Sequence, residues 1–491
     1  MSPSPPPDGA KRLLWIHQNF VSARQTGISR SLYFIAALLH AGWHVDIVCS
    51  RAGYLEESAD LDLTQDVVER EGQLALHRLG VPEGLSTLRS KGRSYFDFNK
   101  RALRYAAGLE RPDLLFASSP PLTVILPAIR LSARQGTPLL FEVRDLWPAF
   151  LVEGGLLKPG PVAWAMEWIE YFCLAFADHV VSVAPAFTTY LERVGVPPAK
   201  LSTVPTGGDP VYLGKDRSQG AKWRAARGLE GRFIALFTGS FNENNGIETL
   251  LEAAELTARR NPQVAWVFAG GGRLKGLVEA AAARLPNVRY LGALPRDAMA
   301  PLYFAADVGL LPRAPWPMQE TVLPGKLFDY LASGLPVLCM AKGQPGLMVE
   351  SSGAGTVLQE RSAPAMADAV LAMAALPPEK RAQLGAAGQR WVLQQMNAYR
   401  MGEELLAVAE RPWPRRTALQ GTLRVLSSAL AATWMLLLRR SSRPVRELSG
   451  EGRHALIAGA FQRWLHRPGA GERVALDHRL PMPRLLSSRE Q

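Results

Sequence analysis

The sequence has few cysteines, and it lacks the long apolar run that a membrane-spanning helix needs. Only Cys49, Cys173 and Cys339 occur among 491 residues, and no two of them form a CxxC pair. Each lies in an apolar stretch, which is typical of reduced core thiols and indicates a cytoplasmic location. No stretch reaches the roughly 18–20 apolar residues of a membrane span. The Pro-rich residues 1–11 lack an apolar segment, which predicts a disordered leader and excludes a signal peptide.

Clustered metal ligands are also missing. The eight histidines are scattered, and no DxD motif has flanking carboxylates suited to Mg²⁺. The sequence therefore predicts neither a metal site nor a cofactor. Acidic residues are scarce in residues 411–491, which hold 15 Arg, no Lys and 5 acids, a net +10 of the +12 carried by the whole chain. The excess charge is thus a property of this C-terminal segment, and no nucleic-acid partner is predicted.

What the sequence does contain is a repeated alternation of short apolar runs and amphipathic segments. Such alternation predicts parallel sheets covered by helices on both faces. In the first half, strands are predicted within residues 12–20, 45–49, 113–117, 138–143 and 179–183. The pattern restarts with predicted strands at residues 232–238, 264–269, 287–292, 308–311 and 336–339.

This pattern predicts an α/β fold with two Rossmann-like domains facing a central cleft. The predicted boundaries are residues 12–208 for the first domain and 215–400 for the second. A return helix and a basic extension, partly apolar, follow in residues 401–491. In such sheets, ligands bind at the carboxyl ends of the strands, which here places them between the domains.

The loop that begins Gly239-Ser240 separates a predicted strand from a predicted helix at residue 247. Glycine allows close approach of the backbone to a ligand, and a helix N-terminus offers free N–H groups to a phosphate. An ordinary turn with its own need for glycine is the alternative. The later triplet at residues 270–272 does not fit GxGxxG, because Lys275 stands at the third glycine position.

Lys326 and Asp329 lie three residues apart at the start of another predicted helix. A cation beside helix N–H groups can neutralise a diphosphate, and the carboxylate one turn later can accept hydrogen bonds from ribose hydroxyls. The alternative is a solvated surface pair of little consequence.

The order and spacing of these motifs resemble the retaining glycosyltransferases of family 4, which have the GT-B fold. The likeness is greatest to a subgroup with bacterial L-fucosamine and colanic-acid transferases. It rests on the opening strand and loop, the Gly239 loop, the Lys326 helix, and residues 141–148, 177–183, 204–209, 268–272, 290–292 and 306–308.

The resemblance implies roles for residues of the second domain. Asp329 takes the place of the family's second motif glutamate, which binds the donor ribose. Thr321 stands at the first motif position, so Glu320, one residue off register, is the candidate for contact with the donor sugar. Lys326 is implied as the main cation on the diphosphate, because the loop after Gly239 lacks the family's Arg and Lys. The backbone at Leu294 is implied to hold the base.

In the first domain, the resemblance places Gly27 near the diphosphate. His17 is a second candidate for substrate binding, or else a hydrogen-bonded core residue. Glu142, Arg144 and Asp145 follow a strand that meets the cleft, which favours a role on the acceptor side for these three residues, with Asp145 as the catalytic member. A buried structural ion pair is the alternative for this trio.

By the same resemblance, the chain is expected to be a hexosyltransferase. It would move a sugar from a nucleotide diphosphate, UDP above all, to a polyprenyl-diphosphate-linked glycan in bacterial cell-surface polysaccharide synthesis. The nucleotide sugar is a substrate rather than a cofactor. A GT-B epimerase, a soluble small-molecule transferase and a non-catalytic nucleotide-sugar-binding protein remain alternatives.

The tail contains a 14-residue apolar run at residues 425–438, with arginines on both sides, and a second apolar stretch at residues 455–465. The run is too short to span a bilayer but suits a helix lying in the interface. It predicts a peripheral protein on the anionic inner face of the cell membrane. The alternative is a helix packed on the body, with its arginines solvated.

Overall fold

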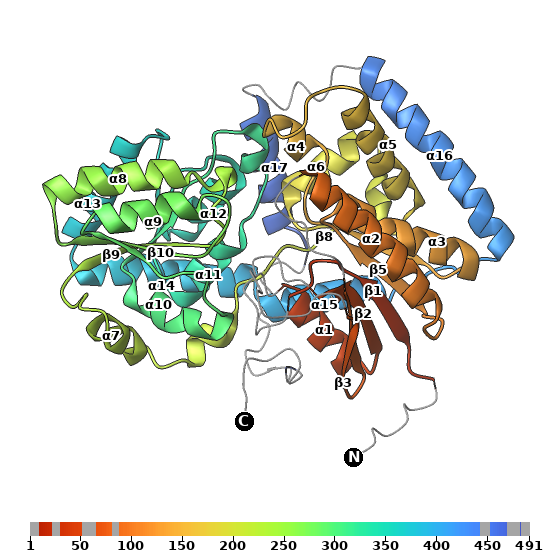
Figure 1. Cartoon of the computed structure of the whole chain (residues 1–491), viewed down its shortest axis with the longest axis horizontal. Coiled ribbons are helices and arrows are strands. Elements are labelled where there is room, and N and C mark those ends of the chain that lie inside the picture. Colours follow the sequence, from red (N-terminus) through yellow and green to blue (C-terminus); the bar gives the residue numbers. More distant parts are fainter. Residues whose placement is uncertain are drawn as a thin grey trace.

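Two parallel sheets lie side by side, and helices cover both faces of each (Figure 1). This arrangement is seen in a computed structural model that describes residues 9–21, 30–51, 65–80, 88–441, 452–468 and 482. The prediction of two α/β domains with parallel sheets is confirmed.

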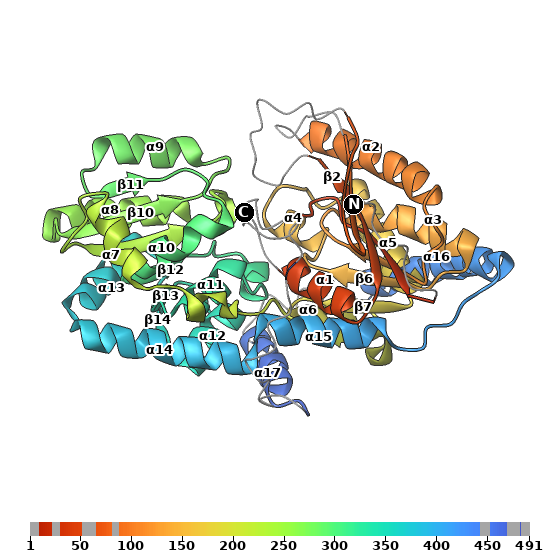
Figure 2. The same ribbon diagram turned by 90° about the horizontal axis from the view of Figure 1, so that it is seen from below.

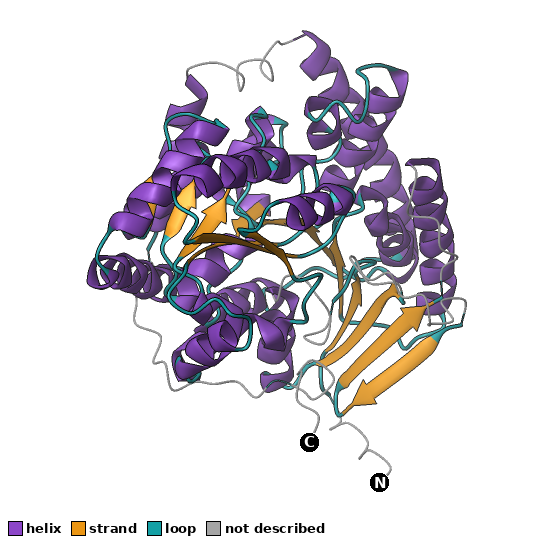
Figure 3. Ribbon diagram, turned by 60° about the vertical axis from the view of Figure 1, so that its left-hand side comes forward, coloured by secondary structure: helices purple, strands orange, loops and turns teal. Residues whose placement is uncertain are grey.

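The sheet of the first domain has eight strands in the order β3-β4-β2-β1-β5-β6-β7-β8. All neighbours are parallel except β3 and β4, an antiparallel pair at one edge (Figure 3). The central strands are buried because helices cover both faces. The strands are β1 (Arg12–Ile16), β2 (His44–Ser50), β3 (Val67–Glu71), β4 (Leu74–Leu79), β5 (Leu114–Ser118), β6 (Leu139–Val143), β7 (His179–Ser182) and β8 (Leu201–Thr203). The helices are α1 (Arg30–His40), α2 (Leu88–Ala107), α3 (Ile125–Gln135), α4 (Ala149–Glu153), α5 (Pro161–Phe176) and α6 (Pro185–Arg193).

The sheet of the second domain is parallel throughout, with the order β11-β10-β9-β12-β13-β14. Its strands are β9 (Phe233–Thr238), β10 (Val264–Ala269), β11 (Val288–Tyr290), β12 (Val308–Leu311), β13 (Val337–Cys339) and β14 (Gly355–Val357). Its helices are α7 (Ser218–Ala225), α8 (Ile247–Arg260), α9 (Lys275–Arg284), α10 (Met299–Ala305), α11 (Gly325–Ser333), α12 (Gly343–Ser352), α13 (Ala363–Ala375) and α14 (Pro378–Gln395).

The chain passes between the domains twice at one place. The Gly208 N–H donates to Met396 O at 2.7 Å, and the Ala398 N–H donates back to Gly208 O at 3.0 Å. Glycine is needed beside this crossing, because a Cβ on Gly207 would stand 2.3 Å from Ala398 Cα. After the second crossing, α15 (Ala398–Ala409) packs on α1 and so returns to the first domain (Figure 2).

Two further helices extend the fold. α16 (Ala418–Ser441) lies along α5 and α3 at the outer edge of the first domain, and α17 (Gly452–Leu465) packs between α6 and α12 (Figure 1). The apolar stretch in α17 is therefore packed against both domains, with Ile457, Phe461 and Trp464 buried. No helix in the described part of the chain is both long and apolar enough to cross a bilayer.

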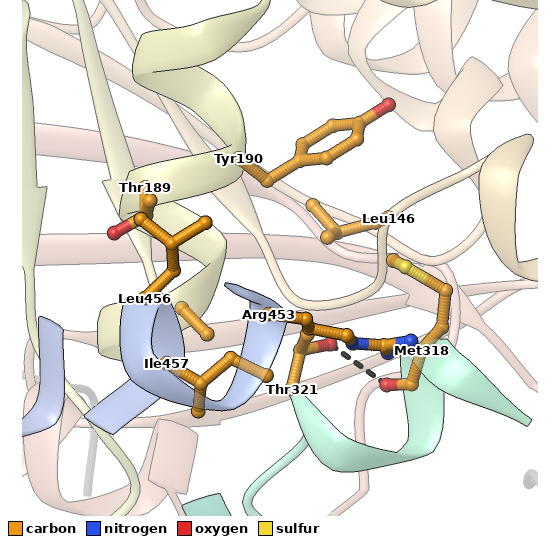
Figure 4. A pocket seen from close by; sticks show the side chains of 9 residues that line it. Leu146, Thr189, Tyr190, Met318, Thr321, Arg453, Leu456 and Ile457 are labelled. Carbon is orange, nitrogen blue, oxygen red and sulfur yellow. Dashed lines mark hydrogen bonds between the residues drawn. The ribbon is translucent and has the colours of Figure 1, made fainter. Parts of the chain in front are cut away.

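A small apolar pocket lies where α17 meets both domains (Figure 4). Leu146 and Tyr190 reach it from the first domain, Met318 and Thr321 from the second, and Leu456 from α17. Because Leu146 follows Asp145 in the chain, α17 borders the region of the first-domain trio.

Candidate active site

The strand order of the second sheet reverses between β9 and β12, since the chain first builds outward through β10 and β11 and then crosses to the other side of β9. Ligands of open α/β sheets bind at the carboxyl ends of strands beside such a reversal. The loop that begins at Gly239 follows β9, and Arg313 follows β12. The reversal point therefore lies between a glycine loop and a basic residue.

Lys326, in the first turn of α11, directs its ammonium group at this loop. Its Nζ donates to Asn245 Oδ1 at 3.3 Å and lies 3.8 Å from the centroid of the Phe237 ring. Gly239, with φ +117°, permits the approach, because a Cβ there would stand 3.1 Å from Lys326 Cε. Burial, followed by the charge of Arg313, lowers the pKa of Lys326 well below its usual value. A bound anion would favour the charged form of this lysine.

Arg313 was not among the residues predicted from the sequence. It is 8% exposed, and its NH1 donates to the same Asn245 Oδ1 at 3.2 Å, while its buried Nε has no hydrogen-bond partner. Burial lowers its pKa to about 10. The sequence did contain a signal for Arg313. It lies two positions after the predicted strand at residues 308–311, whose carboxyl end lies at the same edge of the sheet as the Gly239 loop.

Asn245 is held so that its oxygen faces the two cations. Its Nδ2 donates to Ser240 O at 2.8 Å and to Asn242 Oδ1 at 3.0 Å, which leaves Oδ1 for Lys326 and Arg313. Ser240 thus acts here by orienting the loop. Among the described residues, no carboxylate forms an ion pair with either cation, so one neutral oxygen serves two buried positive groups.

Asp329 lies one turn further along α11. Its Oδ1 accepts a hydrogen bond from Tyr212 Oη at 3.3 Å. Burial raises the pKa of Asp329 to about 6, against the lowering effect of Arg296. Leu294 follows β11 and packs, half-buried, on the main core. Both residues lie on the second domain, as predicted.

Glu320 has partners of its own. Its Oε1 accepts from Arg361 NH2 at 2.7 Å, and its Oε2 lies 3.5 Å from Nε2 of His454 in α17. Its carboxylate is therefore held between the second domain and the C-terminal extension. The structure assigns it an ion pair, and its expected contact with the donor sugar stays a prediction.

The first-domain trio is divided by its contacts. Glu142 accepts a hydrogen bond from Arg30 Nε at 2.7 Å, with both side chains buried. Burial alone would raise the pKa of Glu142, but the charges of Arg30 and Arg144, together with hydrogen bonds from Ser118 and Arg30, outweigh burial and lower the pKa. Arg30 also donates to Pro205 O at 2.6 Å. Glu142 therefore matches the alternative of a structural ion pair.

Arg144 contacts His17, with NH1 2.9 Å from His17 Nε2. Burial, followed by the charge of Arg144, lowers the pKa of His17 well below its usual value, so the ring is neutral and Nε2 accepts. The Nδ1 atom then carries the proton and, buried, has no partner. His17 also stacks on Trp15 with ring centroids 5.6 Å apart. The ring is thus fixed in the core of the first domain.

Asp145 is the member of the trio whose carboxylate forms no ion pair or hydrogen bond among the described residues. Burial raises its pKa to about 6, against the lowering charges of Arg144 and Arg313. Because Arg313 belongs to the second domain, the charge that acts on the Asp145 carboxylate comes partly from the other domain. Gly27, the remaining predicted residue, lies outside the described residues.

Two family models match the chain. The glycosyl transferase 4-like domain matches residues 26–207, and glycosyl transferases group 1 matches residues 232–375. A probable glycosyltransferase of Pseudomonas aeruginosa, WbjE, is 24% identical over 266 residues, 52% of this chain and 64% of that protein. The match thus spans less than two thirds of that relative.

Solved structures share the fold. Sucrose-phosphate synthase from Thermosynechococcus elongatus is 20% identical with a TM-score of 0.63, over 82% of this chain and 98% of that one. Anabaena HepE in complex with UDP and glucose is 15% identical with a TM-score of 0.60, over 82% and 100%. WaaG, a glycosyltransferase involved in lipopolysaccharide biosynthesis, is 16% identical with a TM-score of 0.57, over 82% and 100%.

The fold is therefore that of the GT-B proteins. The chain belongs to the glycosyltransferases. Its first domain matches the glycosyl transferase 4-like domain, and its second domain matches glycosyl transferases group 1.

Proposed function

We propose that this protein transfers a sugar, with retention of configuration, from a UDP-sugar to a glycan in bacterial cell-surface polysaccharide synthesis. The observation that carries the proposal is the pair of buried cations, Lys326 and Arg313, that share one amide oxygen at the carboxyl edge of the second sheet. Solved structures of HepE contain UDP or UDP-glucose, which supports a UDP donor. The retaining outcome and the likeness to L-fucosamine and colanic-acid transferases belong to this proposal.

The donor half-site supplies charge rather than covalent chemistry. When the bond between the anomeric carbon and the diphosphate breaks, the diphosphate takes the electron pair and its negative charge grows. Lys326 and the N–H groups at the start of α11 and α8 stabilise that charge, and one such group contributes about 3–4 kcal/mol. Asp329, ionised at pH 7, accepts hydrogen bonds from the ribose, and the backbone at Leu294 holds the base.

The acceptor half-site lies on the first domain. The acceptor hydroxyl attacks the anomeric carbon on the face that the diphosphate leaves, and its proton passes to Asp145. A carboxylate whose pKa is about 6 is mostly ionised at pH 7 and able to take a proton transiently. His17 and Arg144 position this region, and Gly27 lines the diphosphate side.

The glycan acceptor is proposed to be linked to a polyprenyl diphosphate in the membrane. The support is α16, which packs on the body with one face and exposes apolar side chains on the other. On the packed face, Ala432 is buried and Thr433 Oγ1 accepts from Trp168 Nε1 at 3.0 Å. The exposed side chains follow helical spacing: Leu419, Leu423, Leu426, Leu430, Trp434 and Leu437. We call these six residues the α16 stripe.

The α16 stripe suits the anionic surface of a bilayer. With two residues of α5, it provides eight of the fifteen large apolar side chains that are exposed among the described residues. No acidic residue occurs between residues 411 and 446, so nothing on this segment repels an anionic lipid. An apolar helix face can enter the headgroup boundary, where Trp434 is favoured. The protein is thus proposed to act on the cytoplasmic face of the membrane.

Three arginines near the α16 stripe form ion pairs with the first domain. Arg416 and Arg424 both pair with Asp178, at 2.6 and 3.0 Å, and Arg415 pairs with Asp113. These three residues hold α16 to the body. The alternative of a helix packed on the body is thus seen for one face of α16, but these three arginines form ion pairs and are not merely solvated. The exposed face is the part that we propose for lipid contact.

The test is a donor screen with an undecaprenyl-diphosphate-linked sugar as acceptor, read out by UDP release and by mass spectrometry of the lipid. UDP release together with an enlarged lipid product supports the proposal. A free altered sugar made without acceptor would instead identify an epimerase. UDP-sugar binding with no turnover of any donor would identify a binding protein, and transfer only to water-soluble acceptors would overturn the lipid-linked part.

A further inference from the structure

Arg313 stands out among the buried arginines because the one carboxylate that influences its pKa lies on the other domain. Five arginines among the described residues are less than a tenth exposed, and three of them, Arg30, Arg78 and Arg400, form ion pairs with Glu. A fourth, Arg453, lies in the field of two carboxylates, Glu320 and Glu153. For Arg313, the carboxylate in its field is Asp145, on the other domain, and no ion pair forms.

The surroundings of Arg313 add charge of the same sign. Lys326 donates to the same oxygen of Asn245, and this neutral amide supplies no counter-charge to either group. Among the residues that the structure describes, the buried Nε of Arg313 has no hydrogen-bond partner. A buried cation without a counter-charge destabilises the folded state, and structural positions avoid it. An arrangement of this kind indicates that an anion binds here.

The geometry points to the donor diphosphate as that anion, bound jointly by Arg313 and Lys326. This inference rests on the proposed function and extends the diphosphate site to Arg313, which follows strand β12. The loop of residues 239–246 contains no Lys or Arg. Arg313, which follows β12, supplies the second cation that the loop lacks. Arg313 offers a planar set of donors, including the free Nε, which suits two phosphate oxygens.

The hollow beside Arg313 is open to a ligand. It is bounded by Gly246, Glu248 and Thr249 at the start of α8 and by Trp316 after β12. Glu243 also lines it and forms an ion pair with Arg273. Gly246 is in the left-handed conformation, with φ +53°, and a Cβ there would touch Pro312 at 3.4 Å. The α8 N-terminus and Arg313 therefore face the same space, as an anion site requires.

Two effects of opposite sign follow from this arrangement. Replacing Arg313 by Met should leave the ligand-free protein as stable as the wild type or raise its Tm, because an uncompensated charge is removed. The same change should weaken UDP binding by roughly 10- to 100-fold, the range for a lost hydrogen bond to a charged group. Uridine, which has no phosphate, should bind both proteins alike.

The matched control is Arg224→Met in the same domain. Arg224 forms an ion pair with Asp307 at 2.6 Å and donates to two backbone carbonyls, so its loss should lower Tm and leave the UDP affinity of the folded protein unchanged. Thermal unfolding and calorimetry with UDP, uridine and inorganic pyrophosphate are measured on the full chain. Arg313→Lys, which keeps one charge, should fall between Met and the wild type in UDP affinity.

A lowered Tm with unchanged UDP affinity in Arg313→Met would overturn the inference, since that is the behaviour of a structural arginine. Failure of the proposed function gives a different result. If the wild type binds pyrophosphate but no UDP, and Arg313→Met loses pyrophosphate, the anion site stands and the nucleotide donor is wrong. If the wild type binds neither ligand, the inference is also overturned.

Discussion

Asp145 of the first domain and Arg313 of the second act on each other electrostatically across the boundary between the domains. Burial raises the pKa of Asp145 to about 6, against the charges of Arg144 and Arg313. Burial lowers the pKa of Arg313 to about 10, against the opposing influence of Cys339 and Asp145. The proposed acceptor carboxylate and the proposed donor-side cation therefore influence each other's protonation.

Asp145→Asn should abolish sugar transfer while UDP affinity stays within about twofold, because the two half-sites lie on different domains. Glu142→Gln is the contrasting variant. It breaks a buried pair and leaves Arg30 uncompensated, so it should cost about 3–5 kcal/mol of stability. Calorimetry with UDP and thermal unfolding of both variants decide the matter. Loss of folding or of UDP binding in Asp145→Asn would favour a structural role for this residue as well.

The rate of transfer should fall as the pH drops below about 6, where Asp145 becomes protonated. Stability should change in the opposite sense. The folded state holds the Asp145 proton up to about pH 6 and the unfolded chain only to about pH 4, so this residue's contribution to stability is lost as the pH rises from about 4 to about 6. Asp329 has a raised pKa too and acts in the same direction.

This pH dependence is checked by UDP release between pH 5 and 8 and by denaturant unfolding between pH 4 and 7. Asp145→Asn should lose less stability than the wild type over pH 4–6. Equal slopes for the two proteins would contradict the assignment of the titrating group to Asp145.

Lys326→Ala should lower kcat/KM by about 100-fold or more, since it removes a charge from the leaving diphosphate. Asp329→Ala should chiefly weaken nucleotide binding. Lys275→Ala is the matched control, because Lys275 also begins a helix of the second domain but has a side chain that is 40% exposed and pairs with Glu279. Steady-state kinetics with the donor found in the screen provides the measurement. A wild-type rate in Lys326→Ala would show that the diphosphate lies elsewhere.

The α16 stripe should determine membrane binding. A variant with Leu423, Leu426 and Leu430 changed to Ser should float less with anionic liposomes than the wild type. Removing the tail at Glu410 would be a poorer test, because it would uncover α3 and α5 and delete α17.

The control for flotation changes three exposed leucines outside α16 to Ser. These are Leu213, Leu277 and Leu376. Equal flotation of the stripe variant and this control would rule out the stripe as the lipid contact. A shift of the wild type to dimer in light scattering, lost in the stripe variant, would instead assign the stripe to a second copy of the chain.

Most of the strands that could be predicted are buried and parallel, because such a strand reads as an unbroken apolar run. β4 is an exception, since it is buried and pairs in parallel with β2, but His77 and Arg78 interrupt its apolar run. The edge pair β3–β4 and the short strands β8 and β14 were not predicted. β3 alternates half-buried and exposed residues and carries charge, while β8 and β14 have three residues each, none of them fully buried. Such segments gain their structure from neighbouring strands.

The sequence by itself determined the two domains and pointed to Lys326, Asp329 and the Gly239 loop, since periodicity and the residues at helix starts are local properties. Only the tertiary structure decided which charges are compensated. Arg30 and Glu142 are 112 residues apart, and Lys326 and Asn245 are 81 apart. The free energy of a buried charge depends on groups brought to it by the fold, so the pairing of Glu142 and the uncompensated state of Arg313 become visible only in three dimensions.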